Sequence, residues 1–74
     1  MQDLLPRSAV PLEQVVTVLD DLPNILRATR LRRRLTLAVV AEQLGTGEVN
    51  VHRWERRKAT PTLATARKIL EWAA

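Results

Sequence analysis

The side chains that usually carry out catalysis are scarce in this chain. It has one histidine, His52, no cysteine and no tyrosine, and its carboxylates do not cluster along the sequence. A catalytic site needs a nucleophile or acid–base group with partners close enough to activate and orient it. The lack of cysteine also removes disulfides and thiolate zinc sites. We therefore expect a protein that is not an enzyme and that uses no cofactor, no metal and no small-molecule ligand.

Basic side chains are the main chemical resource of the sequence, and their distribution is uneven. Residues 1–23 contain four acidic residues and one arginine, whereas residues 24–74 contain eleven basic and four acidic residues. A basic body suggests a polyanionic partner. The same arginines could instead only keep a small helical protein in solution. Charge alone does not decide between these two interpretations, so the function must be inferred from a motif.

The motif is a spacing of small and β-branched residues between residues 37 and 56. Ala41 is small enough to allow close contact between two helices, and Gly45, four residues later, can adopt a sharp turn. Val51, six residues beyond Gly45, would close the crossing from the second helix, with Trp54 beneath it. A helix-turn-helix that contacts DNA needs this combination at this spacing. Residues 48–56 would then be the second helix of this motif.

The elements that must hold this motif are helices. Phe and Tyr are absent and there are only two glycines, so hairpins have little support, and the sequence predicts an all-α fold of one domain. Prolines and capping residues divide it into five helices: about 11–21, 23–34, 37–44, 48–56 and 63–72. Pro23 is expected to begin the second helix, Thr36 and Thr62 to cap the third and fifth, and Thr46 or Gly47 to cap the fourth. In the fifth helix, the expected inward positions are Leu63, Ala66, Ile69 and Leu70.

The first of these helices is expected to be an addition to the domain. Its apolar residues follow helical spacing: Leu12, Val15, Val16, Leu19 and Leu22. We therefore divide the chain into an amphipathic N-terminal arm, residues 1–22, and a helix-turn-helix domain, residues 23–74. The stripe must pack either against the core of its own domain or against a second copy of the chain, which would form a homodimer. Trp72, near the other end, leaves the same two possibilities open.

Over about residues 24–72 the sequence resembles the Cro/repressor-type (XRE) helix-turn-helix family, which has a compact five-helix domain. The segments that carry the resemblance are Leu35-Thr36, Val40-Ala41-Glu42-Gln43-Leu44-Gly45, Val51-His52-Arg53-Trp54-Glu55-Arg56 and Pro61-Thr62-Leu63. The resemblance implies structural roles for Ala41, Gly45, Val51, Trp54 and Glu55, and an ion pair between Glu55 and Arg30. It implies that residues 48–56 form the recognition helix and that its side chains facing base edges are Glu48, Val49, His52 and Arg53. The expected phosphate contacts are Asn50, Arg56, Arg57, Lys58, Arg30 and Arg34.

The sequence departs from the family pattern at several of these positions. Leu37 replaces a common glutamine, Arg57 replaces a usual glycine, and Glu48 places a carboxylate toward a polyanion. Arg53 could bond guanine and Glu48 could accept from cytosine N4, although Glu48 could equally stabilise the helix dipole. Leu37 and Val39 are also unusually apolar for a helix that faces DNA.

The resulting expectation is a small transcriptional regulator, similar to a phage repressor, a Cro protein or an antitoxin, that binds a palindromic operator in double-stranded DNA. Two alternatives stay open: an excisionase-like architectural factor, and a helix-turn-helix fold reused for protein interaction. No apolar run in the sequence is long enough to span a membrane, and the start lacks the pattern of a signal peptide. We therefore expect a cytoplasmic protein of a bacterium or a phage-infected cell.

Overall fold

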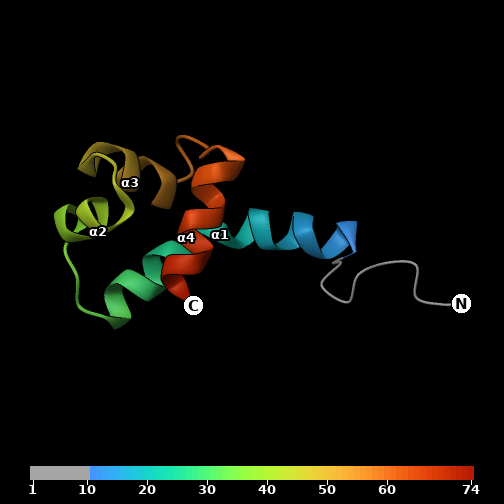
Figure 1. Ribbon diagram of the computed structural model, residues 1–74, viewed down its shortest axis with the longest axis horizontal. Helices are drawn as coiled ribbons and strands as arrows, with labels where there is room; N and C mark the ends of the chain where they lie inside the picture. Colours follow the sequence, from blue (N-terminus) through green and yellow to red (C-terminus); the bar gives the residue numbers. More distant parts are fainter. Residues whose placement is uncertain (1–10) are drawn as a thin grey trace, which may run out of the picture.

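A computed structural model describes residues 11–74, and every regular element in that range is an α-helix (Figure 1). The helices are α1 (Leu12–Arg32), α2 (Leu37–Leu44), α3 (Glu48–Glu55) and α4 (Leu63–Ala73). The all-α prediction is confirmed. The described part has no strand following Pro61, where a winged hairpin of an excisionase-like factor would be expected. The first ten residues of the predicted arm lie outside the described residues.

The prediction of five helices is wrong, because the first two predicted helices are one. Pro23 lies inside α1, and the predicted boundary between residues 22 and 23 falls within this helix. A proline inside a helix removes one backbone hydrogen bond and costs about 3 kcal/mol. The helix continues through it because Leu22 and Leu26, on either side, are both buried in the same core. Burying each such side chain contributes about 1.5–3 kcal/mol, which offsets the cost.

The short helices begin and end where local chemistry predicts. The Thr36 hydroxyl accepts the Val39 N–H at 3.2 Å to cap α2, and the Thr62 hydroxyl accepts the Thr65 N–H at 3.2 Å to cap α4. Both caps satisfy N–H groups that have no partner within the helix. Gly47 occupies the capping position before α3 and has no side chain to form such a bond.

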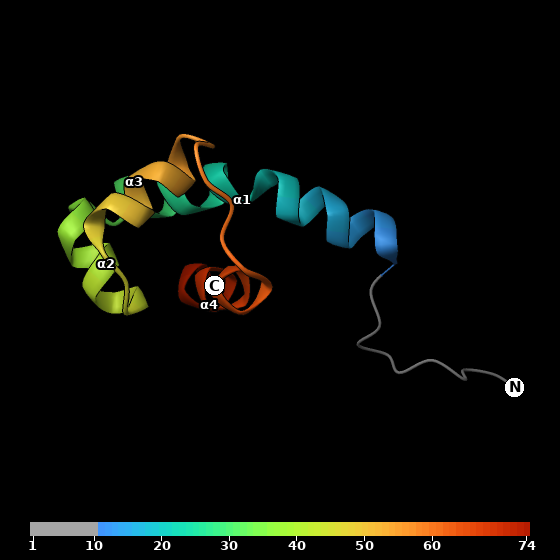
Figure 2. The same cartoon turned by 90° about the horizontal axis from the view of Figure 1, so that it is seen from above.

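One core holds the four helices together. The second half of α1 packs against α4, and α2 packs against α3, so that all four helices contribute side chains to the same apolar centre (Figures 1 and 2). Leu63 is 75% exposed, so its predicted inward position is wrong. It is the first residue of α4, one turn before the helix reaches the core at Ala66. The buried apolar side chains are Leu22, Leu26, Val40, Ala41, Leu44, Val51, Trp54, Ala66 and Ile69.

The first half of α1 extends away from this core (Figure 1). Leu19 packs against the core, but Leu12, Val15 and Val16, earlier on the same stripe, are exposed. The stripe expected to pack in one place is therefore divided between the domain core and solvent. None of the helices described for residues 11–74 combines the length and apolarity needed to cross a membrane.

The two glycines of the turn between α2 and α3 allow a test of this local structure. Gly45 has a φ of +71°, a left-handed conformation that costs a residue with a Cβ about 1–2 kcal/mol. Gly47 has a φ of −90°, and a Cβ placed there meets no atom within 4 Å. We expect Gly45→Ala to lower the free energy of unfolding by about 1 kcal/mol. Gly47→Ser should instead raise it by about 0.3 kcal/mol, because serine supplies the missing cap.

Urea unfolding of the two variants beside the parent protein measures both changes. Equal changes of the same sign would contradict the assignment of the left-handed turn to Gly45.

Candidate nucleic-acid interface

The α2 and α3 helices pack against each other across a sharp turn, with small and branched side chains buried beneath them. Gly45 ends α2 in the left-handed conformation, and the Thr46 N–H donates to the Ala41 carbonyl at 2.9 Å. This bond and the one from the Gly45 N–H to Glu42 satisfy carbonyls at the end of the helix. Ala41 and Val51 are both buried where the helices face each other. The crossing therefore has the geometry of a helix-turn-helix.

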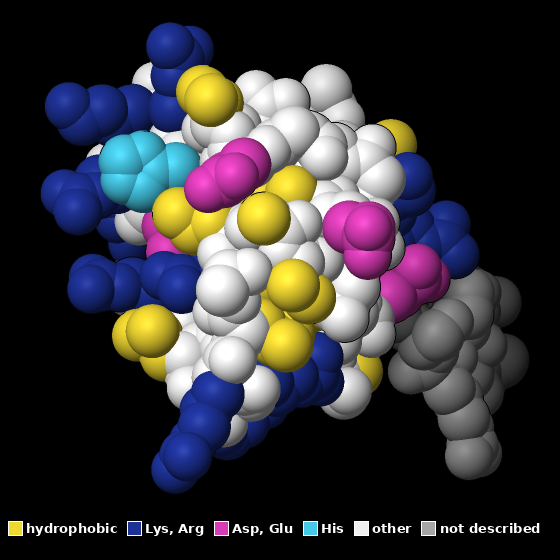
Figure 3. All heavy atoms as spheres, turned by 90° about the vertical axis from the view of Figure 1, so that its left-hand side faces the viewer, with side chains coloured by type: hydrophobic (Ala, Val, Ile, Leu, Met, Phe, Trp, Pro, Cys, Tyr) yellow, Lys and Arg dark blue, Asp and Glu magenta, His cyan; other side chains and the backbone are white. Residues whose placement is uncertain are grey.

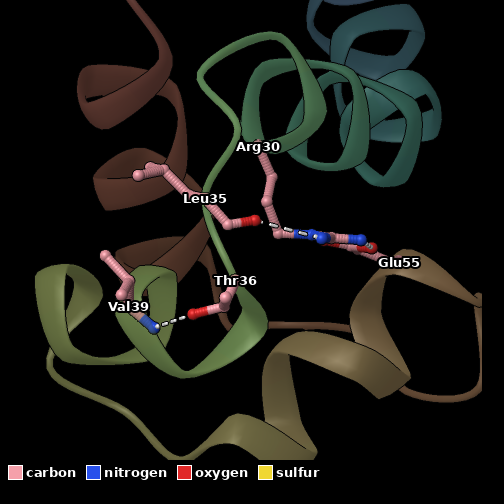
Figure 4. Close-up of polar contacts among 5 residues, drawn as sticks. All are labelled: Arg30, Leu35, Thr36, Val39 and Glu55. Carbon is pink, nitrogen blue, oxygen red and sulfur yellow. Dashed lines mark hydrogen bonds and ion pairs between the residues drawn. The ribbon is translucent and has the colours of Figure 1, made fainter.

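An ion pair fixes α3 to the end of α1. Arg30 donates from Nε and Nη2 to the two carboxylate oxygens of Glu55, at 2.8 and 3.0 Å (Figure 4). Its Nη1 donates to the Leu35 carbonyl at 3.3 Å, which also holds the connection between α1 and α2. The Glu55 side chain is 4% exposed and that of Arg30 is 15% exposed. The ion pair that the family resemblance implied is therefore present.

The electrostatics of this pair follow from its geometry. The hydrogen bond to Glu55 raises the pKa of Arg30 above its already high ordinary value, against the opposing effect of burial. Two parallel N–H···O bonds between a guanidinium and a carboxylate also fix the orientation of both groups. Three of the five donors that an arginine carries are used here. A phosphate contact by Arg30 stays a prediction and would depend on the remaining donors.

The outer side of α3 brings together all four side chains predicted to face bases. Glu48, Val49, His52 and Arg53 line one shallow hollow, together with Leu37 at the start of α2. All four are exposed, whereas Val51 and Trp54, on the other side of the helix, are buried. Figure 3 shows Lys and Arg side chains gathered along the edge of this end of the molecule, with the histidine among them. One side of α3 thus packs into the core, and the other side is exposed and can contact a ligand.

The predicted phosphate contacts lie in different surroundings. Asn50 donates to the Thr46 hydroxyl at 3.0 Å, so its amide is directed toward the turn before α3. Arg34, Arg56 and Lys58 are exposed. Arg57 has a φ of +59°, a left-handed conformation that explains why a glycine would suit this position. The Arg57 side chain lines a separate hollow near the middle of α1. The structure therefore places Arg57 away from the hollow on α3.

A cluster that sequence analysis did not predict joins the ends of α1, α2 and α4. Arg33 lies over the Trp72 ring, 5.0 Å from its centroid, and donates to the Trp72 carbonyl at 2.9 Å. Trp72 donates from its indole N–H to Gln43 at 2.7 Å and packs against the core. Of the two possibilities left open for Trp72, the structure shows contact with its own domain. These residues are 29 to 39 positions apart, so no local spacing could have revealed them.

Comparison with known proteins agrees with this geometry. A family model described as a helix-turn-helix domain matches residues 24–72. No curated protein and no solved structure gives a significant match to the chain. A helix-turn-helix domain indicates DNA binding by a small regulator.

The Arg30–Glu55 pair generates a stability prediction with an internal control. Glu55→Ala leaves a largely buried guanidinium without its carboxylate, and we expect it to cost about 3–5 kcal/mol. Glu71→Ala removes the exposed pair with Arg67 and should cost less than about 0.5 kcal/mol. Thermal unfolding followed by circular dichroism measures both. Similar losses in the two variants would show that the burial of the Arg30–Glu55 pair has no special effect on stability.

Proposed function

The chain belongs to the helix-turn-helix domain family, and on that basis we propose that it binds specific sequences in double-stranded DNA as a small transcriptional regulator. In this proposal α3 is the recognition helix and lies in the major groove. The observation that carries it is the two-sided nature of α3. This helix is fixed to the core by Val51, Trp54 and the Glu55 pair, while four side chains of different chemistry are exposed on its other side.

The exposed side chains of α3 match the groups that base edges offer. Arg53 can donate two parallel hydrogen bonds to guanine O6 and N7, and Glu48 can accept from cytosine N4. His52 has an exposed ring that can donate or accept. Arg34, Arg56 and Lys58 supply positive charge that can neutralise phosphates and position the helix. Base recognition would therefore rest on α3, and backbone contacts on the residues around it.

We further propose that the chain acts as a repressor of the XRE type, similar to phage repressors, Cro proteins or antitoxins, and that it is not an enzyme. The residues quoted for the family resemblance support this assignment. The site of action would be the cytoplasm of a bacterium or a phage-infected cell.

A homodimer on a palindromic operator is the form of binding we propose. One recognition helix of eight residues contacts few base pairs, so specificity generally needs two copies related by a two-fold axis. The surface for the second copy is the exposed stripe of α1, formed by Leu12, Val15 and Val16. This stripe lies on the same face of α1 as Leu22 and Leu26. Pairing it with its equivalent would extend the apolar core across two chains.

A protein-interaction module is the second candidate, because Val39 on α2 is exposed and apolar. Selection of bound sequences from a random DNA pool at low salt distinguishes the two. Enrichment of a defined motif supports the regulator, whereas the absence of any enriched sequence contradicts it. Recovery of two inverted half-sites would support the dimer.

The salt dependence of binding to the selected site is the next prediction. We expect log K to fall by about 0.9 for each phosphate contact as log salt concentration rises, and Arg56→Ala to reduce this slope by about that amount. Arg53→Ala should weaken binding by about 1–3 kcal/mol and relax the preference at one position of the site. Arg67→Ala is the control, because this arginine is already paired with Glu71. Affinity that is independent of salt would contradict phosphate-mediated DNA binding.

The dimer prediction is tested by changing the exposed stripe. The double variant Leu12→Ser/Val16→Ser should stay folded, because Leu12 is 74% and Val16 48% exposed, and should sediment as a monomer. Gln14→Ser, on an exposed position between them, is the control and should leave the mass unchanged. Analytical ultracentrifugation with and without operator DNA measures the outcome. A parent protein that binds its site as a single chain would overturn the proposal.

A further inference from the structure

The hollow on α3 has an apolar part that hydrogen bonding to bases does not explain. Leu37 and Val49 line it, and Val49 is 63% exposed. Leu37 also packs against the core, which gives the hollow a fixed wall from α2. Figure 3 shows hydrophobic side chains directly beside the histidine and next to an acidic side chain on this face. An exposed apolar surface at the centre of a polar interface calls for an apolar group on the partner.

The charges around the hollow limit what this group can be. Among the residues that line the hollow, Arg53 and His52 supply hydrogen-bond donors and Glu48 supplies a carboxylate. A phosphate is disfavoured because it would approach Glu48 and lose its hydration against two aliphatic side chains. The major groove of DNA offers one apolar group on its base edges, the C5-methyl group of thymine. The same methyl group is present on 5-methylcytosine.

Resting on the proposed function, we propose that Leu37 and Val49 form a subsite for the C5-methyl group of one pyrimidine in each bound half-site. His52 and Arg53 follow Val49 by three and four residues, respectively, so they lie one helical turn along the same face. The methyl-bearing base therefore lies close to the base pair that Arg53 contacts. The subsite gives Leu37 a role in specificity, because α2 would then contribute to base recognition together with α3.

Removing one methyl group from the DNA tests this subsite. The selected site is synthesised with each thymine replaced in turn by deoxyuridine, which differs only in lacking the methyl group. Burial of one such group contributes about 0.8 kcal/mol, so we expect binding about fourfold weaker at one position of each half-site and nearly unchanged elsewhere. Where the position is a cytosine, its 5-methyl form should instead bind about fourfold more tightly. These two arms distinguish the two sources of the methyl group.

Variants of the protein assign the effect to the hollow. Val49→Ala should bind the methylated and unmethylated sites with nearly equal affinity, while its unfolding midpoint stays that of the parent, because Val49 is largely exposed. Val39→Ala is the control: Val39 is an exposed valine on α2 that does not line the hollow, and this variant should keep the fourfold difference.

The possible results separate the two proposals. Failure to bind any DNA would overturn the proposed function and the subsite with it. Specific binding that is indifferent to every methyl change would overturn the subsite alone. A methyl effect that persists unchanged in Val49→Ala would also overturn the assignment to this hollow.

Discussion

The bidentate pair between Arg30 and Glu55 is the contact on which the arrangement of the helices depends. It joins the end of α1 to the end of α3, and its third bond, to Leu35, holds the chain that leads into α2. A helix of two turns has little stability of its own, so α3 needs tertiary contacts to stay in place. Loss of either residue would leave the other as an unpaired charge, and this would be costly in free energy because both side chains are largely buried.

The pair matters for function because it divides α3 into two sides. Glu55, Val51 and Trp54 are held within the domain, and Glu48, Val49, His52 and Arg53 are therefore directed outward. Because the pair helps to fix α3, a domain with a small apolar core can hold these outward side chains in a defined orientation. The Arg33–Trp72 contact acts in the same way directly after the end of α1, where it holds the end of α4.

The arrangement of the helices explains what two departures from the family pattern, Leu37 and Arg57, do in this structure. Leu37 lies beside Val49 and gives the outer face of α3 an apolar floor, which a glutamine would make polar. Arg57 occupies a left-handed position that glycine adopts more easily, and the chain accepts this strain just after α3 ends. In place of a glycine, Arg57 provides an additional basic side chain at the surface.

Local chemistry was enough to predict much of this protein. The threonine caps, the left-handed Gly45 and the helical spacing of apolar residues act within a few positions of the chain, so α2, α3 and the helix-turn-helix could be predicted from the sequence. The family resemblance supplied the Arg30–Glu55 pair, which no spacing would have shown. Three features were decided only by tertiary structure: the continuation of α1 through Pro23, the exposure of Leu63 and the capture of Arg33 by Trp72. The first depends on the burial of Leu22 and Leu26 against residues distant in the sequence, whose energy outweighs the local preference at the proline. The other two depend on where α4 lies relative to the core and to the end of α1, which no local preference determines.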